Sequence, residues 1–102
     1  MHRIKSSDRV IMVNSKCVEK RETFALDVAN FLIKDVIVLT KETNLTNLSN
    51  SVVIINDIDL ANSLVDIIAN KSDCKFIIVA PNKTYVCYEL IRLTSLRYSL
   101  DI

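Results

Sequence analysis

The sequence predicts an α+β domain with a single mixed or antiparallel sheet and two helices packed on one face, in the order β-α-β-β-α-β-β. Short β-branched runs alternate with segments whose apolar residues recur every three or four positions. The 102 residues have the size of one domain and contain no repeat or linker. Two apolar runs flank Pro81, and turn-forming residues follow the proline, which favours a C-terminal hairpin.

The first half of the chain is expected to form a strand, a helix and a second strand. Residues 9–14 (RVIMVN) and 36–39 (VIVL) have the β-branched composition of strands. Residues 19–34 form a helix, because a set of apolar side chains falls on one face: Phe24, Val28, Phe31 and Leu32. Residues 41–51 are rich in Asn, Thr and Ser, whose side chains compete for backbone hydrogen bonds, so a loop or an irregular edge is expected.

The second half begins with a strand over residues 51–56 and a helix over residues 60–70. Asp57 or Asp59 is a suitable cap for this helix. Its expected buried face is apolar: Leu60, Leu64, Ile67 and Ile68. We treat residues 1–102 as one domain, with residues 1–8 as a flexible basic arm and residues 94–102 as a tail or an extra short strand.

The stretch after Pro81 decides the fold class. Residues 76–79 form a strand, but residues 85–93 fit either a helix or a second strand. The run Tyr-Val-Cys-Tyr is poor in strong helix formers and follows the turn sequence Pro-Asn-Lys-Thr, which favours an antiparallel hairpin. A helix here would instead indicate the alternative, an α/β Rossmann-like three-layer sandwich.

Composition excludes several classes of function. The chain has no glycine, so a P-loop or a dinucleotide fingerprint is not expected. Its one histidine and three separated cysteines do not form a nucleophilic constellation or a zinc-ligand spacing. The longest apolar runs are too short to span a bilayer, and the amino terminus lacks a secretion signal. We therefore expect a non-enzyme without catalytic residues, metal or cofactor.

Several collinear segments resemble the eukaryotic large-subunit ribosomal protein L-22 family. The match extends over residues 10–93 and rests on the order of the segments. The matching pieces are Cys17-Val18-Glu19, Asp27-Val28-Ala29-Asn30-Phe31, Lys41-Glu42-Thr43-Asn44-Leu45, Ile78-Val79-Ala80, Lys83 and Tyr88-Glu89-Leu90.

This resemblance implies a structural component of the large ribosomal subunit in the cytoplasm. Such a protein binds ribosomal RNA beside neighbouring ribosomal proteins and has no small-molecule substrate or membrane partner. Cationic side chains contact RNA phosphates and displace counterions. The candidates for RNA binding are Arg9, Lys16, Lys20, Arg21, Lys41 and Lys83. Tyr85 and Tyr88 are candidates for base stacking, although a core or half-buried sheet position is the expectation for both.

Two other nucleic-acid families share parts of the pattern. With a parallel sheet, Asp57 and Asp59 resemble the metal-binding Asp pair of a Toprim nuclease or primase domain. That fold has a glutamate where this chain has Asn14, so a degenerate Toprim-like or other Rossmann-like nucleic-acid-processing domain is the alternative function. The kink-turn-binding ribosomal proteins have a similar strand-helix-strand centre, but their RNA loop needs glycine.

Overall fold

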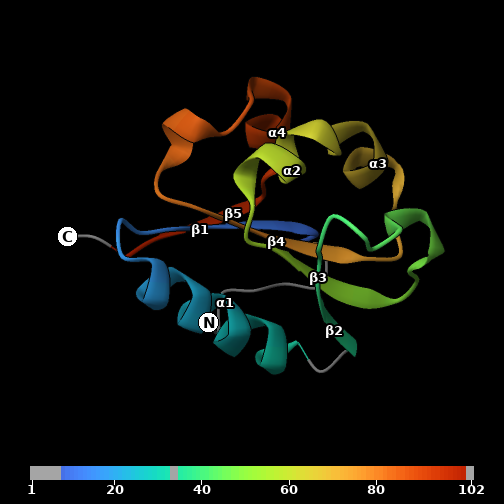
Figure 1. Cartoon of the computed structure of the whole chain (residues 1–102), viewed down its shortest axis with the longest axis horizontal. Helices are drawn as coiled ribbons and strands as arrows, with labels where there is room; N and C mark the ends of the chain where they lie inside the picture. Colours follow the sequence, from blue (N-terminus) through green and yellow to red (C-terminus); the bar gives the residue numbers. More distant parts are fainter. Residues whose placement is uncertain (1–7, 33–34, 101–102) are drawn as a thin grey trace.

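In the computed structural model, which describes residues 8–32 and 35–100, all paired strands of a five-stranded sheet run parallel (Figure 1). The strand order across the sheet is β2-β3-β4-β1-β5. The strands are β1 (Val10–Asn14), β2 (Asp35–Val38), β3 (Ser51–Ile55), β4 (Lys75–Ala80) and β5 (Leu96–Ser99). The predicted mixed or antiparallel sheet is therefore wrong, and the chain has the α/β architecture of the alternative.

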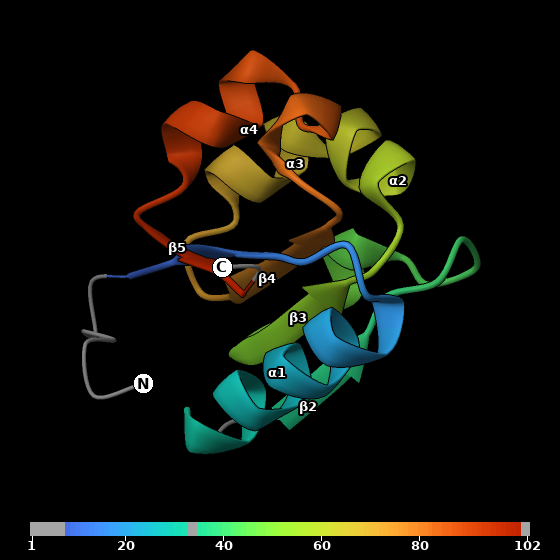
Figure 2. The ribbon, with the colours of Figure 1, turned by 90° about the vertical axis from the view of Figure 1, so that its left-hand side faces the viewer.

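Helices cover both faces of the sheet, which gives three layers (Figures 1 and 2). One face carries α1 (Val18–Phe31), and the other carries α2 (Ile58–Ser63), α3 (Val65–Asn70) and α4 (Tyr88–Leu93). Two 3₁₀ turns, η1 (Leu45–Asn47) and η2 (Lys83–Tyr85), lie in the connections. The prediction of helices on one face only is a further error.

The central strands are buried on both faces. In β3, Val52 and Ile54 pack on the α1 side, while Val53 and Ile55 pack on the side of the other helices. The strands β1 and β4 divide their side chains in the same way. Parallel strands covered on both faces need continuous apolar runs, which explains the VVII and FIIVA segments.

The segment after Pro81 forms a turn and a helix, so the predicted C-terminal hairpin is wrong. Val86 and Leu90 are buried in the core between the sheet and the short helices. Val86 lies in the bend just before α4 and Leu90 lies in its first turn, and the two side chains form one apolar face that packs in this core. Burial of this apolar face outweighs the β propensity of the Tyr-Val-Cys-Tyr run.

A side-chain clamp also fixes this segment against α2. The Nδ2 of Asn62 donates to the carbonyl oxygen of Tyr85 at 2.9 Å. The Oδ1 of Asn62 accepts from the backbone N–H of Cys87 at 2.9 Å. These two bonds satisfy backbone groups just before α4 and hold the chain on the helix side of the sheet.

The predicted helix over residues 60–70 is divided at Leu64 into α2 and α3. Its predicted cap is confirmed, because the carboxylate of Asp57 accepts from the N–H groups of Asp59 and Leu60 at 3.1 and 3.3 Å. In α1, Phe31 was expected to be buried but is 51% exposed, since it is the last residue of the helix.

Residues 1–7 of the predicted arm lie outside the described part of the chain, whereas β5 falls within residues 94–102. Over residues 8–32 and 35–100, none of the helices has the length and apolar character needed to cross a bilayer.

Candidate nucleic-acid interface

The neighbouring strands β1 and β4 form a switch point in the sheet. After β1 the chain turns to α1 on one face, and after β4 it turns to α4 on the opposite face (Figure 2). In open α/β sheets, ligands bind in the crevice outside the carboxyl ends of such strands. We call this region, residues 14–21 and 80–84, the switch-point edge.

Polar groups that are buried at the end of β1 join the two loops of this edge. The Nδ2 of Asn14 and the backbone N–H of Ser15 both donate to the carbonyl oxygen of Ala80, at 3.3 and 3.4 Å. The Oγ of Ser15 accepts from the N–H of Cys17 at 3.1 Å. Because Asn14 and Ser15 are buried and bonded, the loop after β1 has a defined conformation.

Arg21 supports the same loop from the first turns of α1. Its Nη1 donates to the carbonyl oxygen of Ser15 at 3.0 Å, and the side chain is half-buried. The structure thus gives Arg21 a role in shaping the edge. Lys16 and Lys20 are both exposed; Lys16 lies in the loop and Lys20 in the first turn of α1.

The amino terminus of α1 faces the same edge. Cys17 is the N-cap, and its side chain makes no capping hydrogen bond. The first N–H groups of a helix lack intrahelical acceptors and carry partial positive charge. They therefore add to the positive field of Lys16 and Lys20, although Glu19 in the first turn opposes it.

The second loop of the edge carries Lys83, whose backbone lies in the turn η2 after β4. Tyr85 and Tyr88 follow it and are 56% and 69% exposed, so the expected core or half-buried sheet positions are not found. The guanidinium carbon of Arg92 lies 5.8 Å from the centre of the Tyr88 ring, within the range of a cation–π contact.

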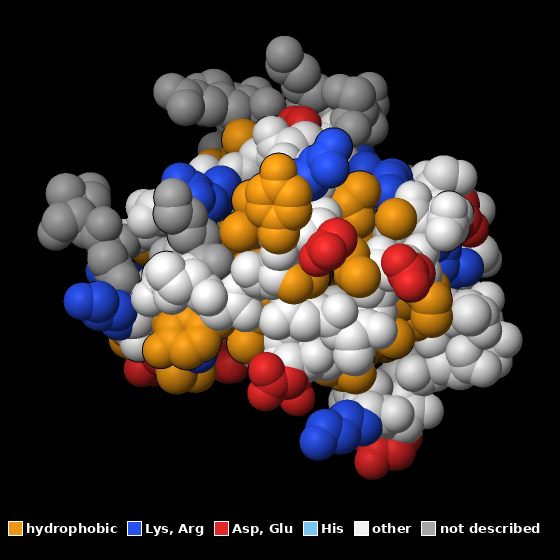
Figure 3. Space-filling model, turned by 90° about the horizontal axis from the view of Figure 1, so that it is seen from above, with side chains coloured by type: hydrophobic (Ala, Val, Ile, Leu, Met, Phe, Trp, Pro, Cys, Tyr) orange, Lys and Arg blue, Asp and Glu red, His pale blue; other side chains and the backbone are white. Residues whose placement is uncertain are grey.

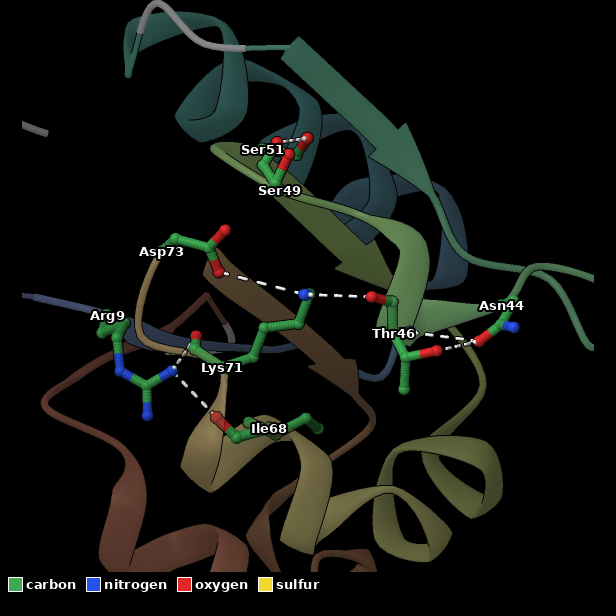
Figure 4. A network of polar contacts seen from close by, with 8 residues as sticks. All are labelled: Arg9, Asn44, Thr46, Ser49, Ser51, Ile68, Lys71 and Asp73. Carbon is green, nitrogen blue, oxygen red and sulfur yellow. Dashed lines mark hydrogen bonds and ion pairs between the residues drawn. The ribbon is translucent and has the colours of Figure 1, made fainter.

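Arg9 lies at the opposite, amino edge of the sheet. Its guanidinium donates to the carbonyl oxygens of Ile68 and Lys71, both at 2.8 Å, and of Ala69 at 3.1 Å. Figure 4 shows two of these bonds beside the contacts of Lys71 with Thr46 and Asp73. Arg9 thus caps the carboxyl end of α3, away from the switch-point edge.

Lys41 is exposed and follows β2, the edge strand on the far side of the sheet. Three strand spacings of about 4.8 Å separate β2 from β1, so at least roughly 14 Å separate the two strand ends. The sequence-predicted set is therefore only partly brought together: Lys16, Lys20, Arg21 and Lys83 share one edge, and Arg9 and Lys41 lie elsewhere.

The face formed by the short helices α2, α3 and α4 differs from the switch-point edge in its distribution of charge. Figure 3 shows it from above, with acidic and basic side chains scattered among hydrophobic ones and, over the described residues, without a continuous basic field. A polyanion would find no concentrated positive potential on this face. The switch-point edge is thus the better candidate.

The two aspartates of the Asp pair lie at the amino end of α2. The carboxylate of Asp57 caps α2, and Asp59 lies in the first turn of that helix. Across the described residues, no group of three or more His, Cys, Asp or Glu side chains is placed to hold a metal ion. A Toprim-like site receives no support from this geometry.

Asn14 and Ser15 build the edge but are not among the residues predicted for the interface. The signal for them is the abrupt change from the apolar run VIMV to Asn-Ser directly before a helix. Comparison of the chain with models of known protein families, with curated proteins and with solved structures gives no match. The functional argument therefore rests on the geometry of the edge.

Proposed function

We propose that this chain is an RNA-binding module that contacts the phosphate backbone at the switch-point edge. One observation carries the proposal: the exposed Lys16 and Lys20 lie on a hydrogen-bonded loop after β1, and Lys83 follows the neighbouring strand β4. The role is binding, and it requires no catalytic group.

The arrangement suits a phosphate backbone for two physical reasons. Each lysine that approaches a phosphate releases condensed counterions, which gives affinity without reading the sequence. A loop that is already ordered by Asn14, Ser15 and Arg21 loses little conformational entropy on binding. With a net charge of +1, the protein as a whole attracts RNA weakly, so binding should depend on this local cluster.

Attachment to the large ribosomal subunit is the wider form of the proposal. Support comes from Cys17-Val18-Glu19, which lies at the switch-point edge. The C-terminal part of the resemblance lends no support, because Ile78-Val79-Ala80 and Tyr88-Glu89-Leu90 lie on a strand and a helix and not on the two strands of a hairpin. RNA binding is therefore the narrower and better founded proposal.

The test is a titration of fluorescently labelled structured RNA with the protein at several salt concentrations. We expect the logarithm of the association constant to fall linearly with the logarithm of the salt concentration. Lys16→Ala and Lys20→Ala should each reduce this slope by about one. Arg92→Ala is the matched control, because it removes one exposed positive charge from α4 and should leave the slope unchanged.

Absence of salt-sensitive binding to ribosomal RNA would refute the proposal. Equal effects of the Lys20 and Arg92 substitutions would refute the location, since a response to net charge alone does not depend on position. Co-sedimentation of the protein with large ribosomal subunits tests the wider form separately.

A further inference from the structure

Among residues 8–32 and 35–100, the strand β5 ends the sheet opposite β2 and pairs with β1 alone. The N–H of Leu100 donates to the carbonyl oxygen of Asn14 at 2.9 Å, while Ser99 is the register partner of Asn14, so Asn14 bonds the residues on either side of Ser99. The backbone groups of Arg97 and Ser99 therefore point away from β1. Such an edge is a template for another strand.

Hollows lie on both faces of this edge. On the α1 side, a groove of about 530 Å³ is lined by residues that include Lys20, Phe24, Asp27 and Leu100. On the other side, a hollow of about 300 Å³ lies between α4 and β5. Side chains of an added strand would therefore find space above and below the sheet.

We propose that β5 pairs with β5 of a second copy of this chain, antiparallel, about a twofold axis that passes beside Tyr98. Two five-stranded sheets then join into one. The pairing of the strands does not require RNA, although the groove beside β5 shares Lys20 with the switch-point edge. A twofold contact is self-complementary and closes, so it produces a dimer and not a fibre.

The side chains favour this register. With Tyr98 opposite its own copy, Leu96 faces Leu100 of the second copy on the α1 side, where all three side chains already pack against the core. On the other face, the exposed Arg97 lies opposite Ser99. A shift by one residue would place Arg97 opposite Arg97, which is destabilising.

The charges around the edge are compatible with a second copy as the partner. The groove contains charges of both signs, Lys20 and Asp27, and the chain has a net charge of only +1. Two copies therefore meet without a strong like-charge repulsion. The register leaves one cationic position, Arg97, opposite an exposed and replaceable hydroxyl.

Opposite charges placed at Ser99 provide the test. Ser99→Glu puts a carboxylate opposite Arg97 twice in each dimer, whereas Ser99→Lys puts an ammonium there. Cross-strand charge pairs of this kind should tighten the dimer about two- to thirtyfold with Glu and weaken it by a similar factor with Lys. Sedimentation equilibrium over a range of concentrations gives the dissociation constants, and circular dichroism checks that both variants are folded.

Concentration-dependent dimers with these opposite shifts support the proposal. A wild-type protein that stays monomeric at millimolar concentration overturns it. A dimer that responds to neither substitution also overturns it, because the contact must then lie on another surface. If both substitutions weaken the dimer equally, Arg97 does not face Ser99 and the register is wrong.

Discussion

The capping of α3 by Arg9 leads to a quantitative prediction. Arg9 precedes β1, yet its guanidinium contacts three carbonyl oxygens at the end of α3, those of Ile68, Ala69 and Lys71. Because the last carbonyls of a helix have no intrahelical donors, the side chain satisfies the carbonyls of Ile68 and Ala69. It also adds a second donor to the carbonyl of Lys71, which accepts from the N–H of Cys74 at 3.4 Å. Arg9→Ala should therefore weaken the attachment of α3 to the sheet.

The magnitude follows from the environment of the bonds. A hydrogen bond to a charged group contributes about 1.5–3 kcal/mol. The two bonds at 2.8 Å are part-buried, and the third, at 3.1 Å, is exposed. We count the lower value for each of the two part-buried bonds and nothing for the exposed one. Arg9→Ala should therefore lower the free energy of unfolding by about 3 kcal/mol. A lysine keeps the charge but not the planar fork, so Arg9→Lys should lose about half as much.

Urea denaturation followed by circular dichroism measures both losses. Arg92→Ala is the control, since Arg92 is exposed and loses only its cation–π contact with Tyr88, and its free energy of unfolding should change by less than about 1 kcal/mol. If Arg9→Ala is as stable as the control, the guanidinium does not hold α3 and the reasoning fails.

Three other predictions concern the helix layer. Asn62→Ala removes both bonds of the clamp and should lower the free energy of unfolding, measured by urea denaturation, by about 1–3 kcal/mol. Asn62→Asp keeps the acceptor for the N–H of Cys87 and should lower it by less. Equal losses for the two variants would contradict the clamp. Asp57→Ala should lower the free energy of unfolding of the protein by about 1 kcal/mol, and Asp57→Ser should lower it by less. A Tm of the wild-type protein that rises when Mg²⁺ is added would contradict the assignment of Asp57 as a helix cap. Leu90→Ala should cost about 2–5 kcal/mol, because this side chain is fully buried in α4, and a loss below about 1 kcal/mol would place it on the surface.

The strands could be predicted from the sequence because they are determined by local composition. The β-branched runs at 9–14, 51–56 and 76–79 all form strands within a residue or two of the expected bounds. The turn after Pro81 is also present, and the side chain of Asn82 accepts from the N–H of Thr84 at 2.8 Å. These features depend on residues that are close in sequence.

The direction of strand pairing could not be predicted in this way. The segment after the turn fits a strand or a helix locally, and the contacts that decide it come from Asn62, which lies 23 and 25 residues from Tyr85 and Cys87. Only the folded protein shows that Val86 and Leu90 enter the core. Tertiary packing decides between two local conformations that the sequence leaves nearly equal.

In the candidate site, too, positions that depend on nearby residues could be predicted, and roles that depend on distant residues could not. Lys16 and Lys20 were correctly placed around the start of the first helix, because that position follows from the strand and helix bounds. The role of Arg9 was not predictable, because its acceptors are backbone carbonyls 59 to 62 residues away. A basic residue in a sequence does not reveal whether its charge faces an external ligand or a helix end.

The most direct test of RNA binding at the switch-point edge is a ¹H–¹⁵N correlation spectrum recorded during titration with structured RNA. We predict that the largest shifts occur at the backbone amides of residues 15–21 and 82–84. Shifts concentrated on β2, α3 or β5, with these amides unchanged, would contradict the proposed interface.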